Sequence, residues 1–233
     1  MTRLLYMDDS YLKEWDTNIL ETEGSSVVLE ETAFYPRGGG QPSDTGTITA
    51  NGIDYRVLEV KKEDGKIRHK LDKGGASGIA HCRIDWDHRY KIMRMHTASH
   101  LIATILNQKT GALITGNQLG EEKSRIDFST EEYSPELMQE VIKSANALIK
   151  EGTPVKWYYL SREEAMKIPG IVKLADKLPP SIQTLRIVEI EGIDKQADGG
   201  THVRNISEIG SIELIKTENK GKNNRRMYFR LNP

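Results

Sequence analysis

The chain has 233 residues with 33 basic and 34 acidic side chains, a balance that excludes binding of nucleic acid through global positive charge and leaves only local patches. One cysteine, Cys82, excludes a disulfide framework and predicts a reducing compartment. The sequence shows no signal peptide and no apolar run of roughly 20 residues, so we expect a soluble, cytoplasmic protein with no membrane partner.

The first third of the chain has the pattern of short β-strands. Residues 26–30 form an apolar run that predicts a strand. Asn51-Gly52 lies between residues 45–50 and 53–60 and predicts a type I′ hairpin, and Asp64-Gly65 predicts a second hairpin. Residues 79–85 predict a further strand. Short strands at this spacing favour a small β-barrel, and we expect a barrel domain over residues 1–88.

The pattern changes to helical spacing after Asp87. Apolar and small residues recur three and four positions apart in one stripe, which predicts a helix: Ile92, Met95, Ser99, Ile102 and Leu106. His96 and His100 share one face of this helix at the border of the stripe. We therefore expect them at the edge of a core, where a cleft forms.

Helix and strand signals alternate in the remainder of the chain. Ser134 and Pro135 begin a second helix, which Gly152 ends. A capping box over residues 161–164 predicts a short helix that stops at residues 169–170. Strand alternation follows over residues 185–190, 212–215 and 227–231. We therefore expect an α+β domain over residues 89–233 and a boundary near residue 88.

Four potential metal ligands occur in two i, i+4 pairs that lie far apart in the sequence. The first pair is His96 and His100, on the predicted helix. The second pair is Asp198 and His202, which enclose two glycines and therefore lie in a turn. Two helical histidines at this spacing also occur by chance, but the second pair favours one site that tertiary folding closes. Imidazole and carboxylate groups are both zinc ligands.

Residues 34–46 form a loop rich in glycine, in which Gly38, Gly39 and Gly40 precede Gln41. Alone this loop is a weak signal, since a plain turn is its usual explanation. It lacks the Lys-Ser/Thr ending of a P-loop, and no helix follows it as a dinucleotide-binding motif requires.

Together, these segments resemble the editing domain of alanyl-tRNA synthetase and its free-standing relatives, the AlaX proteins. The motifs that carry the resemblance are Gly38-Gly39-Gly40-Gln41, His96-x-x-x-His100 and Gly199-Gly200-Thr201-His202-Val203. Further matching stretches are Arg125-Ile126-Asp127-Phe128, Arg186-Ile187-Val188, Ile209-Gly210 and Lys220-Gly221-Lys222. The resemblance covers nearly the whole chain, and a barrel followed by an editing domain is similar to the medium-sized AlaX class.

The resemblance implies a trans-editing hydrolase that cleaves the ester between a wrong amino acid, chiefly serine and also glycine, and tRNA(Ala). It implies one Zn²⁺ per chain on His96, His100, Asp198 and His202, and we expect no obligate protein partner. Catalysis is expected to involve the three histidines and Gln41. Two roles of the metal stay open: activation of a bound water, or holding of the substrate amino group and carbonyl while a separate water attacks.

The pocket in which a synthetase binds alanine rejects serine only imperfectly, so a second, hydrolytic site is needed. This second site has to accept serine and refuse alanine. A polar group that bonds the serine hydroxyl does this, since alanine would leave that group unpaired. The expected substrate contacts are Thr32, Gly39, Gly40 and Gln41. The structural alternatives are that Thr32 belongs to a strand and that Gln41 only stabilises the turn.

The chain departs from the family pattern at one ligand. The family has cysteine at the first position of the second pair, and this chain has Asp198. A hard carboxylate replaces a soft thiolate, so we expect weaker zinc binding and stronger competition from other divalent metals. Cys82 lies in a predicted strand and is expected in the barrel core rather than at the metal.

The tRNA has to be held by local positive charge. Arg94 precedes the histidine pair by two residues, Arg204 follows His202, and the last strand is basic. The residues expected to contact tRNA phosphates are Arg94, Arg204, Lys220, Lys222, Arg225 and Arg226. For the basic tail, a solvated surface strand explains the charge equally well.

Two other functions compete with the deacylase. The first is a tRNA-binding accessory protein whose catalysis is weakened or lost because Asp198 replaces cysteine. The second is an editing enzyme for another amino acid, since the editing domain of threonyl-tRNA synthetase carries a similar pair of motifs; the Gly-rich loop and the barrel argue against it. A zinc peptidase is disfavoured because residues 96–100 lack the glutamate of the helical peptidase signature.

Overall fold

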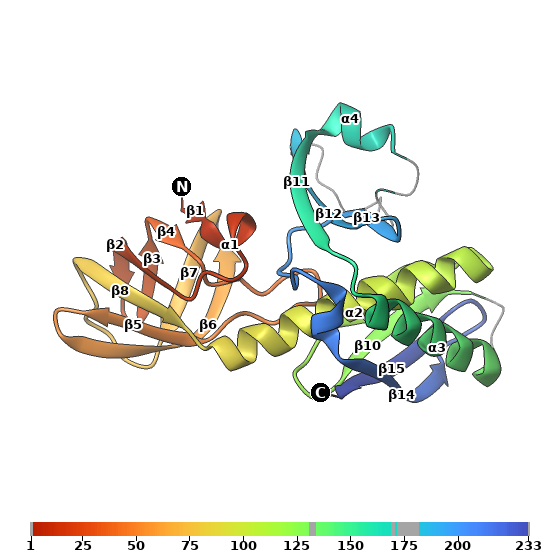
Figure 1. Ribbon diagram of the computed structural model, residues 1–233. Coiled ribbons are helices and arrows are strands. Elements are labelled where there is room, and N and C mark those ends of the chain that lie inside the picture. The colour runs from red at the N-terminus through yellow and green to blue at the C-terminus, as the bar shows by residue number, and fades with distance from the viewer. Residues whose placement is uncertain (1, 131–133, 169–170, 172–181, 233) are drawn as a thin grey trace. The chain divides into compact units, whose positions relative to one another are not determined.

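The computed structural model describes residues 2–130, 134–168, 171 and 182–232 (Figure 1). Its contacts divide the chain into two compact units, Met1–Ile92 and Met93–Pro233. The first unit contains a closed β-barrel and the second mixes helices and sheets, which confirms the expected α+β fold. The division falls within helix α2 (Trp86–Thr110). Within the described residues, no helix is long and apolar enough to cross a membrane.

Unit 1 is built around six strands that close into a barrel. Their order is β2 (Glu14–Glu23), β3 (Ser26–Leu29), β7 (Lys66–Leu71), β6 (Ile53–Glu63), β5 (Gly46–Ala50) and β8 (Ile79–Ile84). Along β6 the side chains of Tyr55, Val57 and Val60 are buried. A β-bulge between Val57 and Glu59 shifts the alternation by one residue, which is why Val60 also points inward.

Two short strands and a short helix complete unit 1. Strand β1 (Arg3–Leu4) pairs in parallel with β4 (Glu31–Thr32), and α1 (Leu5–Asp8) follows β1 directly. Cys82 lies in the barrel core with 0% of its surface exposed, as expected. Burial raises the pKa of its thiol to about 12, so the side chain acts as a small apolar group.

The two predicted hairpin turns are confirmed. Asn51 and Gly52 have φ values of 53° and 75°, and Asp64 and Gly65 have values of 50° and 74°. Positive φ at both central residues is the type I′ geometry, whose twist matches that of the flanking strands. Strand β2 was not predicted, because its ten residues are mostly polar and acidic and only Trp15 and Thr17 are buried.

Gly46 begins strand β5 where two backbones approach closely. A Cβ atom at this position would lie 2.1 Å from the carbonyl oxygen of Arg83 and 2.9 Å from the ring of Phe34. Gly46 pairs with Ile84 of strand β8. Any side chain here would push β5 away from β8, so the closure of the barrel requires glycine.

A buried ion pair fastens the start of α2 to the Gly-rich segment. Arg89 is 0% exposed and contacts both carboxylate oxygens of Asp44. It also donates to the carbonyl oxygens of Ser10 and Ala33, at 2.8 and 2.6 Å. Asp44 in turn accepts from the backbone N–H of Tyr35. Loss of one partner from such a pair costs about 3–5 kcal/mol, because the other charge stays buried.

His69 lies inside the barrel with both ring nitrogens in contact with polar atoms. Nδ1 is 3.3 Å from the carbonyl oxygen of Val27, and Nε2 is 2.8 Å from Oγ1 of Thr32. A carbonyl only accepts, so Nδ1 carries the proton and the Thr32 hydroxyl donates to Nε2. Burial lowers the pKa of His69 to about 4, and the hydrogen bond to Val27 opposes this shift.

Unit 2 contains a four-stranded antiparallel sheet covered by helix α3 (Pro135–Glu151). The strand order is β14 (Ser211–Asn219), β15 (Arg225–Asn232), β10 (Ser124–Ser129) and β9 (Leu113–Gln118). Ser134 caps α3 by accepting from the N–H of Leu137 at 3.0 Å, and Gly152 ends it with φ of 75°. Both ends of this helix were predicted correctly.

A smaller sheet of unit 2 carries part of the functional site. It contains β11 (Val155–Ser161), β12 (Thr184–Ile190) and β13 (Asp194–Ala197), in that order. The predicted capping box is present at Ser161 and begins α4 (Arg162–Met166); the predicted stop at residues 169–170 lies outside the described residues. A short 3₁₀ helix, η2 (Ile206–Ile209), leads into β14.

Helix α2 differs from the one-sided amphipathic helix that its stripe predicted. Every residue from 95 to 106 is buried, so this stretch of the helix is covered on all sides. The polar side chains in this stretch bond locally: Thr97 donates to the carbonyl oxygen of Met93 and Ser99 to that of His96. A search for apolar spacing treats Thr and Ser as polar and therefore as exposed. The apolar stripe for this reason predicted only one buried face of a helix that is buried on all faces over this stretch.

We predict that His69 stays neutral in the folded barrel down to about pH 4. The unfolded chain binds this proton near pH 6.5, so the stability contributed by neutral His69 is complete above pH 6.5 and is lost as the pH falls towards 4. The total loss is about 3 kcal/mol. NMR titration of the imidazole, assigned by comparison with His69→Gln, should give a midpoint near 4; a midpoint near 6.5 would contradict this environment.

Candidate metal centre

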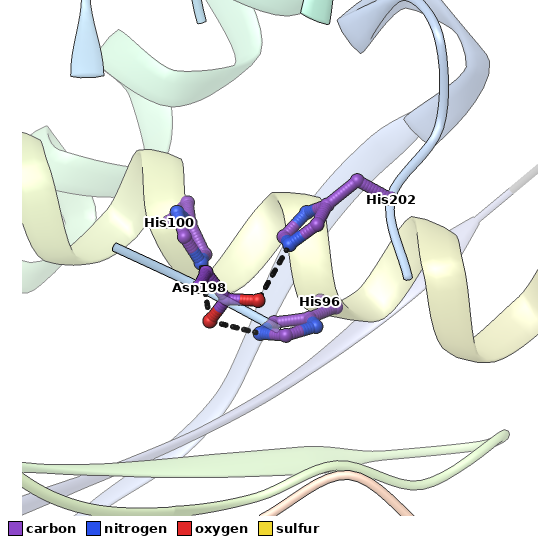
Figure 2. A group of neighbouring side chains, drawn as sticks. All are labelled: His96, His100, Asp198 and His202. Atoms are coloured by element: carbon purple, nitrogen blue, oxygen red, sulfur yellow. Dashed lines mark hydrogen bonds and ion pairs between the residues drawn. The ribbon is translucent and has the colours of Figure 1, made fainter. Parts of the chain in front are cut away.

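Tertiary folding brings the two ligand pairs together in unit 2. His96 and His100 project from consecutive turns of α2, and Asp198 and His202 come from the segment after β13 (Figure 2). One donor atom from each of the four residues lies within 4.8 Å of every other. The predicted group of four therefore exists as a cluster.

The distances within the cluster suit a tetrahedral ion. The Asp198 carboxylate lies 3.6 Å from Nε2 of His96, 3.8 Å from Nε2 of His100 and 3.2 Å from Nε2 of His202. Four ligands at zinc bond lengths of about 2.0–2.1 Å are roughly 3.4 Å apart along the edges of a tetrahedron. The three distances from Asp198 are close to this value and every other donor pair lies within 4.8 Å, so the side chains would have to close around a divalent ion.

The cluster opens towards solvent at Asp198. The side chains of His96 and His100 are each 6% exposed and that of His202 is 4% exposed, whereas 23% of the Asp198 side chain is exposed. A water molecule or substrate would therefore approach the group from the carboxylate side.

Arg186 of β12 holds the turn that carries Asp198. One guanidinium nitrogen donates to the carbonyl oxygens of Asp198 and Gly200, at 3.1 and 3.0 Å. The backbone N–H of Gly200 donates to Oδ1 of Asp198 at 2.5 Å, which closes the turn on its own side chain. The expected turn geometry of this motif is therefore confirmed.

Further polar side chains orient two of the histidines. Nδ1 of His100 is 3.0 Å from Oδ2 of Asp194, and that oxygen also accepts from Gln196 at 2.7 Å. Nδ1 of His202 is 3.2 Å from Oγ1 of Thr97, whose own proton goes to a carbonyl oxygen. In both histidines Nδ1 is thus the donor, and Nε2 faces the cluster as ligands require.

Burial and mutual charge set the protonation of the cluster. Burial lowers the pKa of His202 to about 4 and holds that of His96 well below its ordinary value. Burial acts in the same direction on His100, but hydrogen bonds to Asp194 and Asp198 outweigh it and raise its pKa to about 9. Burial raises the pKa of Asp198, but the three histidines hold it well below its usual range.

The predicted substrate contacts all lie in unit 1. Thr32 ends β4 and is 0% exposed; its oxygen also accepts from the N–H of Phe34 at 3.2 Å. Gly39 and Gly40, with φ of 58° and 85°, form a tight turn closed by two backbone hydrogen bonds between Gly38 and Gln41. Gln41 itself is 1% exposed. The Gly-rich loop is therefore a hairpin-like turn whose last side chain is buried.

The predicted tRNA contacts divide into two groups. Arg94 donates to the carbonyl oxygens of Ile209 and Asn232, and Arg226 forms two bonds with Asp127, so these guanidiniums also support the fold. Arg225 bonds to residues of the β14–β15 turn. Exposed positions are occupied by Arg204, Lys220 and Lys222; Lys220 also contacts Glu218 at 2.7 Å.

The residues that support the ligands were not predicted from the sequence. Asp194, Gln196 and Asp198 alternate along one extended segment, and this period-2 pattern of polar residues was the available signal for a shared face. Arg186 and Thr97 carried no such signal. Their roles depend on contacts across 12 residues to Asp198 and 105 residues to His202.

Two family profiles match the chain. The profile described as "Threonyl and Alanyl tRNA synthetase second additional domain" matches residues 185–228, which include Asp198 and His202. The profile described as "tRNA synthetases class II (A)" matches residues 7–87, which cover most of the barrel unit.

Whole-length relatives share one name. The chain is 48% identical to "Alanyl-tRNA editing protein AlaX-M" of Saccharolobus solfataricus, with 100% of both chains covered. It is 46% identical to the protein of the same name in Methanosarcina barkeri, with 99% of both covered. It is also 37% identical to "Alanine--tRNA ligase" of Thermococcus kodakarensis over 93% of this chain and 24% of the ligase.

Asp194→Asn is expected to lower zinc affinity by about 10–100-fold, because His100 would lose the carboxylate that orients its ring. Competition with a chelating dye measures this affinity. Glu163→Gln, which removes a carboxylate that is 81% exposed and paired with Lys167, is the matched control and should leave the affinity unchanged. Equal affinity in both variants would remove Asp194 from the site.

Asp198→Cys is expected to tighten zinc binding and to reduce competition from magnesium and manganese, because a thiolate is a softer ligand than a carboxylate. The same dye competition, repeated with each metal, gives the selectivity. Unchanged zinc affinity would show that Asp198 is not a ligand.

Proposed function

The chain belongs to the family of alanyl-tRNA editing proteins AlaX-M, and from this premise we propose that it hydrolyses the ester between a wrong amino acid and tRNA(Ala). The wrong amino acid is chiefly serine, with glycine as a second substrate. The ester is cleaved at the cluster of His96, His100, Asp198 and His202, with one Zn²⁺ per chain as cofactor.

One observation carries this proposal: four ligand groups from two distant segments converge, and hydrogen bonds orient two of the three imidazoles. The contacts with Asp194 and Thr97 engage Nδ1 of His100 and of His202. Those bonds leave Nε2 of His100 and His202 aimed at a common centre, as a metal site requires.

The reaction is an ester hydrolysis. The oxygen of a water molecule bonds to the carbonyl carbon, the bond from that carbon to the ribose oxygen breaks, and the ribose oxygen takes up a proton. The products are the free amino acid and uncharged tRNA. A metal at this centre supplies Lewis-acid chemistry, either by lowering the pKa of a bound water or by polarising the carbonyl.

The residues of the chain hold the reacting groups in place. His96 and His202 have lowered pKa values, so their imidazoles are neutral at neutral pH and can act as metal ligands. The Asp198 carboxylate is ionised and lies at the exposed side of the group, where the substrate enters. Arg186 fixes the turn, so the carboxylate keeps its position as substrate binds.

The Gly-rich turn supplies the selection of the amino acid in this proposal. Gly39 and Gly40 have no side chains, and the amide of Gln41, which is 1% exposed, carries both a donor and an acceptor, the groups that recognise a serine hydroxyl. Thr32 stays a candidate contact, although its hydroxyl already bonds to His69. Alanine has no hydroxyl, so it would leave such a group unpaired and be spared.

Binding of the tRNA body is assigned to the exposed cations of unit 2. Arg204, Lys220 and Lys222 are exposed and reach solvent. Arg94, Arg225 and Arg226 contribute positive charge while they support the fold. Contacts of this kind to phosphates make tRNA binding weaken steeply as salt rises.

Deacylation of seryl-tRNA(Ala), with alanyl-tRNA(Ala) as the comparison, tests the function directly. We expect zinc-loaded protein to release serine while it spares alanine. Binding of tRNA(Ala) with no release of serine or glycine, with zinc supplied, would instead favour an accessory protein whose catalysis is lost. In that case we would attribute the loss of catalysis to Asp198, and Asp198→Cys would be expected to restore the release of serine.

His100→Ala is predicted to lower the rate of serine release by more than about a hundredfold, because loss of a ligand exceeds the effect of losing an orienting group. Binding of tRNA(Ala), measured by filter retention, should stay within about twofold, since the cations of unit 2 are unchanged.

His81→Ala is the matched control for this substitution. His81 is exposed on the barrel, where it pairs with Asp16, so its loss should change neither rate nor binding. Serine release at the wild-type rate by His100→Ala would discard the metal centre as the site of hydrolysis.

A further inference from the structure

Two large aromatic side chains are exposed side by side on the edge strand β11. Trp157 is 41% exposed and Tyr159 is 43% exposed. Their ring centroids are 5.9 Å apart in an edge-to-face arrangement. Being two residues apart on one strand, they project from the same face of the sheet. Exposed aromatic residues on a strand are a common platform for unpaired RNA bases.

This face of the sheet is the one that carries the metal ligand. Tyr159 pairs with Arg186 of β12, and the N–H of Asp198 donates to the carbonyl oxygen of Arg186 at 3.0 Å. Tyr159, Arg186 and Asp198 therefore form one row across the sheet. Neighbouring strands are about 4.8 Å apart, which places the backbones of Tyr159 and Asp198 about 10 Å apart.

Arg186 links the aromatic pair to the ligand turn. Its guanidinium carbon is 5.7 Å from the centre of the Trp157 ring, within the range of a cation–π contact. The same guanidinium bonds to the backbone of Asp198 and Gly200. The platform and the ligand turn are thus held by one side chain.

The opposite face of this sheet is already covered. Tyr158 and Leu160 of β11 pack with a cluster of buried apolar residues that includes Ala165 of α4 and Ile187 of β12. One apolar core lies on that side; on the other face Val188 and Ile190 of β12 are buried as well, while Trp157 and Tyr159 of the edge strand stay exposed. Trp157 and Tyr159 therefore serve no role in that core.

We propose that Trp157 and Tyr159 stack on the unpaired 3′-terminal nucleotides of the aminoacyl-tRNA, an inference that rests on the proposed deacylase function. The ester of the substrate has to lie at Asp198, and the ribose and base of the last nucleotides are the chemical groups attached next to it. The aromatic pair lies about 10 Å from Asp198 along the row of Tyr159, Arg186 and Asp198, which is where we expect those bases to lie. Stacking on aromatic rings tolerates any base and orients the ester.

The test uses full-length zinc-loaded protein and tRNA(Ala) with 2-aminopurine in place of the terminal adenine, whose fluorescence falls when it stacks. Wild-type protein is expected to quench the probe. Trp157→Leu and Tyr159→Leu should lose most of the quenching and raise the protein concentration for half-maximal serine release roughly tenfold. Trp157→Phe, which keeps a ring, should stay within about threefold of wild type.

Met166→Ala is the matched control, because Met166 is 55% exposed on α4 and belongs to neither the platform row nor the metal ligands. It should behave as wild type. Zinc content and melting temperature are recorded for each variant, and if Trp157→Leu does not fold, Tyr159→Leu and Trp157→Phe decide the outcome.

The outcomes separate this inference from the proposed function. Quenching that depends on Trp157 in a protein that releases no serine would keep the platform and discard the deacylase. Serine release with equal quenching and equal half-saturation in all variants would overturn the platform. A difference in oligomeric state between wild type and the leucine variants, with quenching intact, would also overturn it and assign the face to contact between copies.

Discussion

Arg186 maintains the turn on which the metal centre depends. A guanidinium carries five N–H groups, and Arg186 is 5% exposed, so those groups have to find acceptors inside the protein. Two of the acceptors are the carbonyl oxygens of Asp198 and Gly200. The turn therefore keeps the path that satisfies the guanidinium, and this path places the Asp198 carboxylate opposite the imidazoles of α2. The buried guanidinium thus joins β12 to a turn that begins 12 residues further along the chain.

A divalent ion that binds at this centre has to displace a proton from His100. The raised pKa of His100 means that its ring holds a proton at neutral pH, and the lowered pKa of Asp198 keeps the carboxylate charged. A cation that binds Nε2 of His100 displaces that proton and replaces one positive charge with two beside the carboxylate. His96 and His202 already present neutral nitrogens. The arrangement suits a metal held by nitrogen and oxygen ligands.

Sequence patterns predicted the elements whose signals are local. The hairpins at Asn51-Gly52 and Asp64-Gly65 and the helix between Ser134 and Gly152 follow from backbone chemistry, and the structure confirms them. The ligand group was also predicted, because two i, i+4 pairs carry their own signal and the family resemblance joined them. The supporting residues were not predicted, since Thr97 and Asp194 become meaningful only when β13 lies against α2. The polar strand β2 and the burial of α2 on all sides also depend on tertiary packing, which a one-dimensional period does not contain.

We propose that a carboxylate stands in place of a thiolate among the metal ligands, and X-ray absorption at the zinc edge of the zinc-loaded protein can detect this exchange. We expect one zinc per chain with nitrogen and oxygen neighbours at about 2.0–2.2 Å and no sulfur neighbour at about 2.3 Å. Protein that retains no zinc would contradict the proposed metal site. A zinc–sulfur distance would also contradict it, because the free cysteine Cys82 is buried in the barrel core and is not among the proposed ligands.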